Sequence, residues 1–242
     1  MIRFFSLLLL NFFDFFYKKK IINFIKKKKF DNFNIVFDVG AHKGESLELY
    51  LKNFKINEIY SFEPSHYSFN YLRRKVSKNN KKKLKTKIII ENFALGEHSK
   101  KIKIKQMNES SSSTIKELNI DSSYFKKKKK LLFNLEKENL YNEILVEQKS
   151  IDEYMHQKKI KKLDFLKIDT EGYEFEILLG AKKNINNINL VLFEHHYDDM
   201  IKKNYKFSDV HDFLNKNNFN QIFKAKMPFR KTFEYIYKNK TY

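Results

Sequence analysis

The chain has 242 residues, 42% of them hydrophobic, which is enough apolar surface to bury one large core. The formal net charge is +20, from 49 lysines and arginines against 29 acidic residues, a balance that attracts phosphates, anionic lipids or acidic glycans. Only four of these cations are arginines, the residue best suited to bidentate recognition of phosphates and bases, so a dedicated nucleic-acid-binding function is disfavoured. The absence of cysteine excludes disulfides, thiolate catalysis and thiolate metal sites, and it fits a cytoplasmic enzyme.

Residues 1–33 differ in composition from the rest of the chain and form a separate N-terminal helical segment in our interpretation. Residues 4–17 are mostly apolar, and two lysine runs follow, at 18–20 and 26–29. A membrane-spanning helix needs about 20 apolar residues, and Asn11 and Asp14 interrupt this shorter run. No small-residue cleavage site of a signal peptide follows it. Two alternatives remain open: a helix docked on the protein's own core, or peripheral contact with the inner membrane face, with the lysines at the headgroups.

From residue 34 the chain alternates apolar strands with amphipathic helices. Residues 34–40 form a continuous apolar run that ends in Asp-Val-Gly, the pattern of a strand buried on both faces. Strands joined by crossover helices favour a parallel sheet covered on both faces. The sequence therefore predicts an α/β, Rossmann-like domain over residues 34–242, with a mostly parallel sheet and one antiparallel edge strand. The expected strands are residues 34–40, 58–63, 87–95, 164–169, 190–195, 219–226 and 233–237.

Residues 100–160 are the least regular part of the chain. Residues 100–106 alternate like an exposed strand. Thr114 and Ser150 each precede a glutamate by three residues, so both resemble capping boxes that start helices. The lysine run 126–130 lies in an insertion near residues 116–142, which we interpret as a solvated surface segment and not as a binding site.

The five glycines, at positions 40, 44, 96, 172 and 180, are informative because the composition otherwise disfavours this residue. Glycine is retained where the backbone conformation or a close approach requires it. The first predicted strand runs into Asp38, Gly40, Ala41 and Gly44 and then into a helix, whose first N–H groups are free to bind a ligand. The turn lacks the full Gly-x-Gly-x-x-Gly pattern, which disfavours a nicotinamide cofactor.

Glu63 ends the second predicted strand, 19 residues after Gly44. An acid at this position of an α/β nucleotide-binding fold accepts hydrogen bonds from ribose hydroxyls. A carboxylate suits this task because an ionised carboxylate only accepts hydrogen bonds, and the ribose offers two donors. The glycine turn and Glu63 together predict a site for a ribose-bearing cofactor.

Acids and histidines follow two further strands. Asp169 and Glu171 end the fourth strand of the predicted sheet, and Glu194, His195 and His196 end the fifth. Ligands of open α/β sheets bind outside the carboxyl ends of the strands, so these residues predict a second, polar part of the site. One of the two histidines must point away if the strand continues through both. The same acids and a histidine could bind a metal, but no local ligand pattern demands one, and none is predicted.

Six short blocks of sequence carry a resemblance to a known family. They are Asp38-Val39-Gly40-Ala41-x-x-Gly44, Phe62-Glu63-Pro64, Asn92-x-Ala94-Leu95-Gly96, Ser150-Ile151-Asp152, Leu166-Lys167-Ile168-Asp169-x-Glu171-Gly172-x-Glu174 and Gly180-Ala181. In this order and spacing, over about residues 34–200, the chain resembles the FkbM-type methyltransferases. The resemblance implies a class I methyltransferase fold with strand order 3-2-1-4-5-7-6, S-adenosylmethionine as methyl donor, and acceptors that are hydroxyls of sugars or polyketide-type natural products.

The resemblance also implies roles for single residues. His42 stands where the family usually has asparagine, and because both residues hydrogen-bond locally, we expect His42 to remain part of the cofactor site. Asp169 and Glu171 would lie beside the reacting centre. The implied cofactor residues are Asp38, Gly40, Ala41 and Gly44 on the methionine side, Glu63 at the ribose and Asn92 near the adenine.

Methyl transfer from a sulfonium is an in-line displacement, so the main task of such an enzyme is to align the acceptor with the S–CH3 axis. A hydroxyl acceptor must also lose a proton, and we expect the general base to be Asp169 first, then His196 or Glu171, with Glu194 in the same site. The predicted partner is a small-molecule or glycan acceptor. Two alternatives stay open: an RNA methyltransferase on the same fold, favoured only by the charge, and a non-catalytic, membrane-attached relative.

Overall fold

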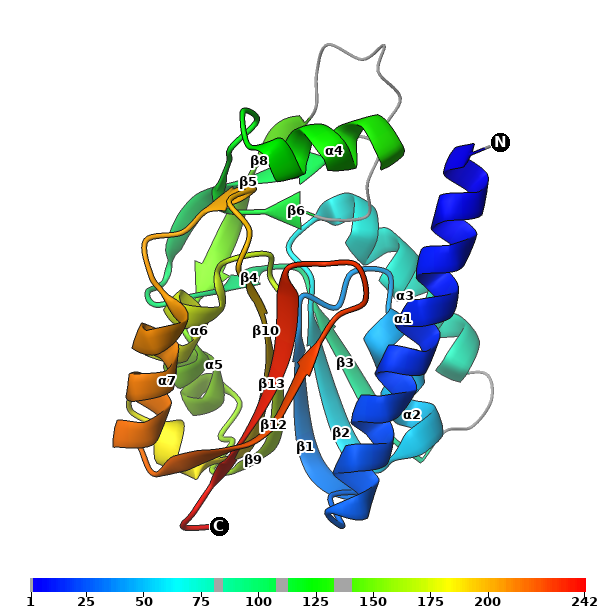
Figure 1. Cartoon of the computed structure of the whole chain (residues 1–242). Coiled ribbons are helices and arrows are strands. Elements are labelled where there is room, and N and C mark those ends of the chain that lie inside the picture. The colour runs from blue at the N-terminus through cyan, green and yellow to red at the C-terminus, as the bar shows by residue number, and fades with distance from the viewer. Residues whose placement is uncertain (1, 81–84, 108–112, 133–140) are drawn as a thin grey trace.

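The computed structural model describes residues 2–80, 85–107, 113–132 and 141–242, and a seven-stranded sheet lies at its centre. The strand order is β12-β13-β10-β9-β1-β2-β3 (Figure 1), which confirms the predicted fold and its order 3-2-1-4-5-7-6. The strands are β1 (Asn32–Val39), β2 (Lys55–Phe62), β3 (Lys87–Glu91), β9 (Leu163–Ile168), β10 (Ile188–His196), β12 (Phe219–Lys226) and β13 (Thr232–Asn239).

The position of the antiparallel strand differs from the prediction. β13 runs antiparallel to both of its neighbours, β10 and β12, and β12 forms the edge. β13, the second strand of the closing hairpin, therefore lies between β10 and β12, the first strand of that hairpin. This arrangement pairs both sides of the β13 backbone, and Tyr235, Ile236 and Tyr237 at its centre are fully buried. The prediction of an antiparallel edge strand was wrong in this respect.

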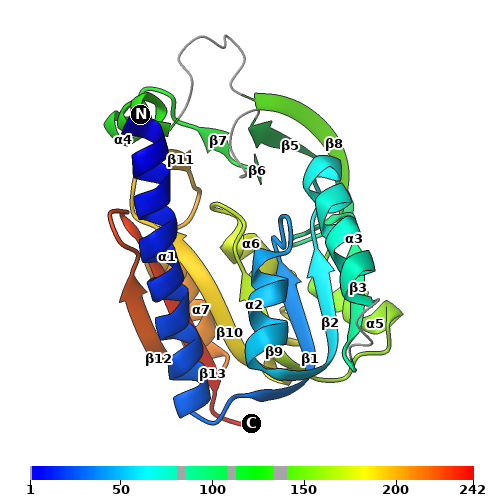
Figure 2. The same cartoon turned by 90° about the vertical axis from the view of Figure 1, so that its right-hand side faces the viewer.

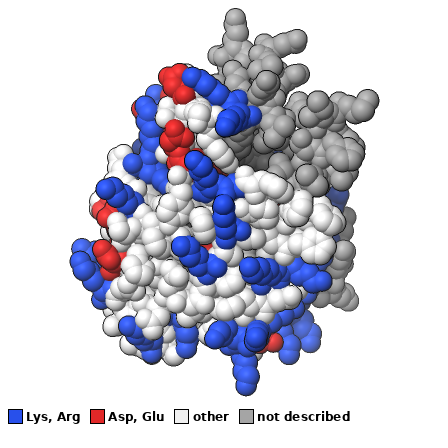
Figure 3. Space-filling view, viewed as in Figure 1, with Lys and Arg blue, Asp and Glu red and all other residues white. Residues whose placement is uncertain are grey.

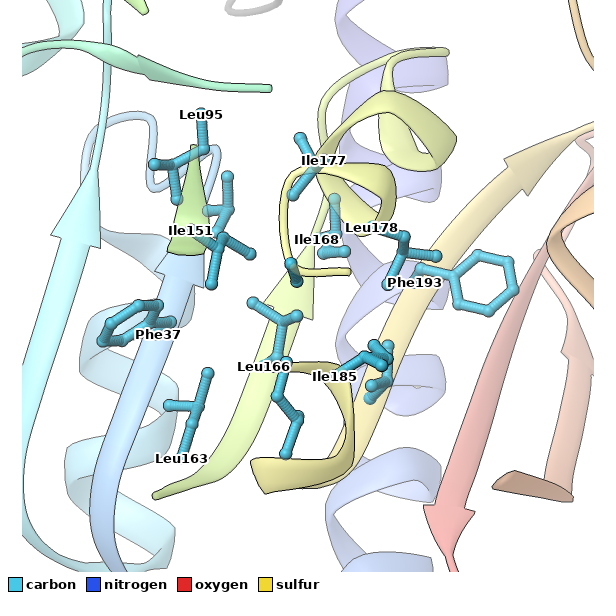
Figure 4. Close-up of a cluster of buried hydrophobic side chains, with 14 of the residues drawn as sticks. Phe37, Leu95, Ile151, Leu163, Leu166, Ile168, Ile177, Leu178, Ile185 and Phe193 are labelled. Atoms are coloured by element: carbon cyan, nitrogen blue, oxygen red, sulfur yellow. The ribbon is translucent and has the colours of Figure 1, made fainter. Parts of the chain in front are cut away.

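The sheet separates two apolar layers because its central strands are buried on both faces. Figure 4 shows the layer on one face, where Phe37 and Leu166 from the strands meet Ile177 and Leu178. The opposite layer contains Val36 from β1 and Phe165 from β9. Figures 1 and 2 show that α1 (Ile2–Lys27), α2 (Glu45–Asn53) and α3 (His66–Asn80) cover one face, and that α5 (Ile151–Gln157), α6 (Glu174–Leu179) and α7 (Phe207–Lys216) cover the other.

The C-terminal half of α1 is docked on the protein's own sheet. Its buried residues Tyr17, Ile21, Ile22 and Ile25 belong to the same apolar layer as β1 and α2. The Tyr17 hydroxyl donates to the carbonyl oxygen of Ala225 on β12 at 2.8 Å. The first of the two alternatives for the N-terminal segment is therefore present in the structure. Within the part of the chain that the structure describes, no helix has the length and apolar character needed to cross a membrane.

A smaller group of elements lies beyond the carboxyl ends of the central strands (Figures 1 and 2). One four-stranded sheet has the order β4-β8-β5-β6, and a two-stranded ribbon joins β7 to β11. Ile102 and Ile104 of β5 are buried beneath this sheet's outer face, so the strand predicted as exposed has one buried side. These elements are β4 (Ala94–Leu95), β5 (Lys100–Met107), β6 (Ser113–Thr114), β7 (Glu117–Leu118), α4 (Ser123–Leu132), β8 (Tyr141–Lys149) and β11 (Ile201–Lys202). The 3-10 helix Ile185–Asn187 lies at the opposite end of the central sheet, directly before β10.

Two local predictions for the middle of the chain had different outcomes. Ser150 caps α5 as expected, since its hydroxyl accepts the N–H of Glu153 at 3.1 Å. Thr114 starts no helix, and that prediction was wrong. Its hydroxyl accepts the N–H of Lys116 at 3.0 Å and donates to the carbonyl oxygen of Glu171 at 2.9 Å, which fixes a turn between β6 and β7.

Candidate active site

A cavity of about 400 Å³ opens at the carboxyl ends of β1, β2, β9 and β10. This volume falls in the range of sites that enclose small molecules and cofactors. The turn after β1 forms its floor, α1 forms one wall through Lys18, Ile21 and Ile22, and the small sheet closes it with Ile104 and Thr114. The predicted position of the site, at the carboxyl edge of the sheet, agrees with this cavity.

Gly40 allows the turn after β1 to approach β9. Its φ is +74°, and a Cβ at this position would lie 1.9 Å from the carbonyl oxygen of Asp169, so no other residue fits. The N–H groups of Gly40 and Ala41 both donate to the carbonyl oxygen of Phe62 at 3.0 Å, which ties the turn to β2. Gly40, Ala41 and His42 line the cavity, whereas Gly44 caps α2 and lies behind them.

Asp38 supports the turn from behind and does not line the cavity. Its carboxylate is fully buried and accepts hydrogen bonds from the Ser46 hydroxyl at 2.8 and 2.9 Å. The ammonium group of Lys167 lies 3.0 Å from the same carboxylate and 3.1 Å from the carbonyl oxygen of Gly40. Burial alone lowers the pKa of Lys167, but Asp38 and Asp169 more than offset this, and the net pKa lies above its ordinary value. Lys167 is therefore charged, and it joins β1 to β9 beneath the cavity.

Glu63 lies at the end of β2 with its carboxylate against the cavity. One oxygen accepts the N–H of His42 and the other accepts the N–H of Ser65, each at 2.9 Å. Each carboxylate oxygen has two acceptor positions, so capacity remains for the two hydroxyls of a ribose. Burial raises the pKa of Glu63 to about 6, against the lowering effect of the Ser65 N–H and of His42. The carboxylate is thus ionised at neutral pH and fits the predicted ribose contact.

His42 offers a second polar group to a cofactor. Its Nδ1 lies 3.1 Å from the carboxylate of Glu45, and its φ of +49° is unusual for a residue other than glycine. The Nε2 atom is buried, and the described residues give it no hydrogen-bond partner. Because His42 lines the cavity, this unpaired atom is suited to a polar group of a bound ligand.

Asn92 shapes the cavity without lining it. Its side-chain amide donates to the carbonyl oxygens of Glu63 and Pro64, at 2.8 and 3.2 Å, and so holds the turn that follows β2. The residues after it, Phe93 and Ala94, provide the apolar surface of the cavity on this side. A contact between Asn92 and the adenine remains a prediction.

Asp169 and Glu171 follow β9 and line the cavity beside the turn. The Asp169 side chain is 43% exposed, and its carboxylate lies 3.6 Å from the ammonium group of Lys167. Glu171 has a φ of +52°, and Gly172 follows it at +95°. This tight loop is held by Glu174, a buried acid at the first position of α6, whose carboxylate accepts the N–H of Gly172 at 3.0 Å.

His196 is buried among carboxylates behind the cavity wall. Its Nε2 lies 3.1 Å from Glu194 and 3.2 Å from Glu171, both of which line the cavity, and its Nδ1 lies 3.6 Å from Asp198. Burial lowers the pKa of His196, but the hydrogen bond to Asp198 and the charges of Glu171 and Glu194 raise it well above its ordinary value. The imidazole is therefore protonated at neutral pH and orients the two glutamates.

His195 points to the opposite face of the sheet, as the strand period requires. It packs at 4.8 Å from the ring of Tyr197 and 5.6 Å from that of Phe207. Burial lowers the pKa of His195 to about 3, so this imidazole is neutral.

Glu234 is a cavity-lining carboxylate that the sequence analysis missed. It lies on β13 directly opposite Glu194 of β10 in the antiparallel register. Burial raises the pKa of Glu234 to about 8, with further contributions from the charges of Glu194 and Asp169. A single acid inside an apolar strand, between Phe233 and Tyr235, was the available signal, but its position depends on pairing between β10 and β13. Lys18 was missed in the same way, because it reaches the cavity only through the docking of α1.

No group of three or more histidines and acids has the geometry of a metal site in residues 2–80, 85–107, 113–132 and 141–242. The acids near His196 are arranged around its protonated ring instead. Asp169, Glu171, Glu194 and Glu234 all line the cavity, and we call these four residues the carboxylate wall.

Comparison with known proteins decides the family. Residues 38–220 match the model of the methyltransferase FkbM domain, which spans most of the chain. The chain belongs to the FkbM methyltransferases. This FkbM methyltransferase is accordingly dependent on S-adenosylmethionine, and the cavity, the unpaired His42 nitrogen and the free capacity of Glu63 fit that cofactor.

Solved structures support the fold of this FkbM methyltransferase. The FkbM methyltransferase of Methylobacillus flagellatus KT is 16% identical, with a TM-score of 0.52, over 86% of this chain but only 44% of that chain. Magnesium protoporphyrin IX methyltransferase of Synechocystis PCC 6803, solved with bound S-adenosylhomocysteine, is 7% identical, with a TM-score of 0.53, over 95% of this chain and 85% of that chain. The present chain therefore spans less than half of the Methylobacillus protein. No curated protein matches the sequence.

Proposed function

We propose that this methyltransferase transfers the methyl group to a hydroxyl of a sugar, a glycan or a natural product. The observation that supports this proposal is the carboxylate wall, whose four acids line the same cavity as the glycine turn. Ionised carboxylates accept hydrogen bonds from hydroxyls, and Glu234, which its pKa of about 8 keeps mostly protonated at neutral pH, can also donate one, so such a wall suits a polyhydroxylated acceptor. It is also a source of a general base, which a hydroxyl acceptor requires.

Asp169 is the general base in this proposal. Its backbone adjoins the glycine turn, since its own carbonyl oxygen is the atom that Gly40 approaches. Its side chain is 43% exposed, so it can reach an acceptor, and its carboxylate lies 3.6 Å from the ammonium group of Lys167. His196 is an unsuitable base because its ring is protonated and turned toward Glu171 and Glu194. We assign it a positioning role.

Bound S-adenosylmethionine supplies an electrophilic methyl group on a sulfonium. The residues of this chain then have three tasks: Glu63 and His42 hold the nucleoside end, the carboxylate wall orients the acceptor, and Asp169 accepts its proton. The apolar lining from Leu192, Phe93 and Ile104 limits the access of water. Holding both reactants in line accounts for much of the rate enhancement expected of such an enzyme.

RNA is the main rival acceptor, and it is favoured only by the net charge of +20. On the face shown in Figure 3, lysines and arginines are scattered over the surface and do not gather into one stripe. A nucleic-acid-binding surface generally concentrates its cations along a groove or a helix. The acidic character of the cavity also opposes a polyanionic acceptor.

The proposal is tested by incubating the purified protein with labelled S-adenosylmethionine and fractionated extracts of the native cell. We expect label in a glycan, lipid-linked glycan or small-molecule fraction, with an alkali-stable methyl ether as product. Label in RNA that ribonuclease removes would overturn hydroxyl methylation of such acceptors. Binding of the cofactor without label in any fraction would favour the non-catalytic alternative.

A further inference from the structure

The exposed side of α1 carries large aromatic side chains just before its docked half. Phe12, Phe15 and Phe16 are 55%, 62% and 52% exposed, and Phe229, in the turn between β12 and β13, is 70% exposed. We call these four residues the aromatic patch. A soluble surface rarely exposes several large aromatic rings together without using them for binding.

The aromatic patch is held in place by contacts within the fold. The ring of Phe13 packs edge-to-face on Phe229, with centroids 5.0 Å apart. Asp14 accepts a hydrogen bond from the guanidinium of Arg230 at 2.8 Å. These two contacts join α1 to the β12–β13 turn, so residues 12–16 and the turn present their rings as one surface.

The backbone of Phe229 adds a second observation. Its φ is +60°, in the left-handed region that a bulky side chain seldom adopts. A glycine or asparagine would hold this turn with less strain. Among the side chains that the structure describes, the most exposed large hydrophobic one is placed here, which points to a use for the ring outside the folded domain.

Cations flank the aromatic patch on both of its segments. Lys19 and Lys20 are exposed on α1, three and four residues after Phe16, and so continue the same side of the helix. Lys226 and Lys231 are exposed at the two ends of the β12–β13 turn. The single acid in residues 12–20 and 226–231 is Asp14, which Arg230 neutralises. An aromatic centre with a cationic rim is complementary to an anionic lipid surface.

The aromatic patch lies near the mouth of the active-site cavity. Lys18, Ile21 and Ile22, in the turns of α1 that follow the patch, line that cavity. Figures 1 and 2 show the N-terminal end of α1 and the β12–β13 turn on the side of the molecule toward which the central strands point. A surface that binds the aromatic patch would therefore face the side of the molecule on which the cavity opens.

We propose that the aromatic patch docks this protein on an anionic membrane surface, with the four rings in the interface and the flanking lysines at the headgroups. The docking is peripheral, since no described helix is able to span a bilayer. A corollary, which rests on the proposed function, is that the methyl acceptor is carried at this surface, as in a lipid-linked glycan.

Vesicle flotation tests the docking without any need for catalysis. The full chain is mixed with phosphatidylcholine vesicles that contain or lack phosphatidylglycerol, and compared with a variant carrying Phe12→Ser, Phe15→Ser, Phe16→Ser and Phe229→Ser. We expect the wild type to float with the anionic vesicles, and the variant to partition at least about tenfold less because its apolar anchors are lost. Vesicles without phosphatidylglycerol should also bind the wild type more weakly.

The control is Tyr242→Ser, which removes an exposed aromatic ring at the opposite end of the chain and should float like the wild type. Unchanged binding of S-adenosylhomocysteine by the patch variant would show that its fold is intact. Equal flotation of variant and wild type would overturn the proposal. The proposal would also be overturned if neither protein floats. Sedimentation velocity with and without RNA would then detect whether the aromatic patch instead mediates self-association or RNA binding. If the wild type does not bind S-adenosylhomocysteine, the proposed function is contradicted, and the far-ultraviolet circular dichroism of the two proteins then serves as the control for the fold, so that the flotation result stays interpretable.

Discussion

Glu63 illustrates how one side chain both shapes and serves the site. Its two oxygens accept the N–H groups of His42 and Ser65, so it closes the turn after β1 against the turn after β2. The same carboxylate faces the cavity, where its remaining acceptor positions fit ribose hydroxyls. Its pKa of about 6 places its ionisation near the lower end of the physiological range.

Cofactor affinity should therefore depend on Glu63 and on pH. We expect Glu63→Gln to weaken binding of S-adenosylhomocysteine by about 10- to 100-fold, because hydrogen bonds to a charged group are worth about 1.5–3 kcal/mol. Wild-type affinity should fall as the pH drops through about 6, because protonation removes acceptor positions from the carboxyl. Titration calorimetry measures both effects. Glu58→Gln, on the same strand but outside the cavity, serves as the control, and equal losses in both variants would remove Glu63 from the site.

Asp169 is tested by a change that keeps its shape. Asp169→Asn should lower kcat by about 100-fold or more, since a general base contributes about 10²- to 10⁴-fold, while the Kd for the cofactor changes little. Steady-state kinetics with the identified acceptor and calorimetry separate the two quantities. Asp199→Asn, at an exposed position shortly after β10, is the matched control. Full turnover of Asp169→Asn would exclude Asp169 as the base.

Among the elements, α1 packs on the sheet and forms one wall of the cavity. Its buried residues share an apolar layer with β1, β9 and α2, and Ile21 and Ile22 among them, together with Lys18, line the cavity. The family model begins at residue 38, so this helix lies outside the matched region. The helix takes this position because its apolar face, formed by Tyr17, Ile21, Ile22 and Ile25, is buried on the part of the sheet that α2 and α3 leave uncovered.

The docking of α1 should contribute to global stability. We expect Ile25→Ala to lower the free energy of unfolding by about 2–5 kcal/mol, because Ile25 is 1% exposed and its removal leaves a cavity. Asn23→Ala, exposed on the same helix, should change it by less than about 0.5 kcal/mol. Urea denaturation compares the two variants. A small and equal effect of both would mean that α1 is not part of the cooperative fold.

Most elements of the central sheet could be predicted because each has a local signal. Apolar runs that end in Asp, Glu or Gly marked the strands to within two or three residues of their observed bounds, as at β1 and β9. Residues 87–95, predicted as one strand, instead form β3 and β4 in two different sheets, because the chain turns at Asn92 and Phe93. That division depends on pairing with β8, about 50 residues away, which no local pattern contains.

The whole molecule determines which side chains meet at the site. The glycine turn, Glu63, Asp169 and Glu171 were predicted because each follows a parallel strand and such ends share one edge. Glu234 and Lys18 were missed because β13 enters the sheet antiparallel and α1 docks from outside the pattern. His196 was placed correctly on its strand, but its charge depends on acids contributed by three segments.

Glu234 should make the stability of the molecule depend on pH. Its pKa of about 8 lies above that of an unfolded glutamate, near 4.5, so the native state binds more protons than the unfolded state between these values. The free energy of unfolding therefore falls as the pH rises through this window. Glu234→Gln should raise stability relative to wild type by about 2–4 kcal/mol at pH 8.5 and have little effect near pH 4.5. Thermal unfolding at the two pH values measures this, and Glu147→Gln, an exposed acid on β8, should show no such difference.

The most direct measurement of the central claim is a crystal structure of the protein with S-adenosylhomocysteine. We expect the nucleoside in the cavity above Gly40, with ribose hydroxyls about 2.6–3.2 Å from the carboxylate oxygens of Glu63 and the sulfur facing Asp169. A nucleoside bound elsewhere, with Glu63 held only by His42 and Ser65, would contradict it.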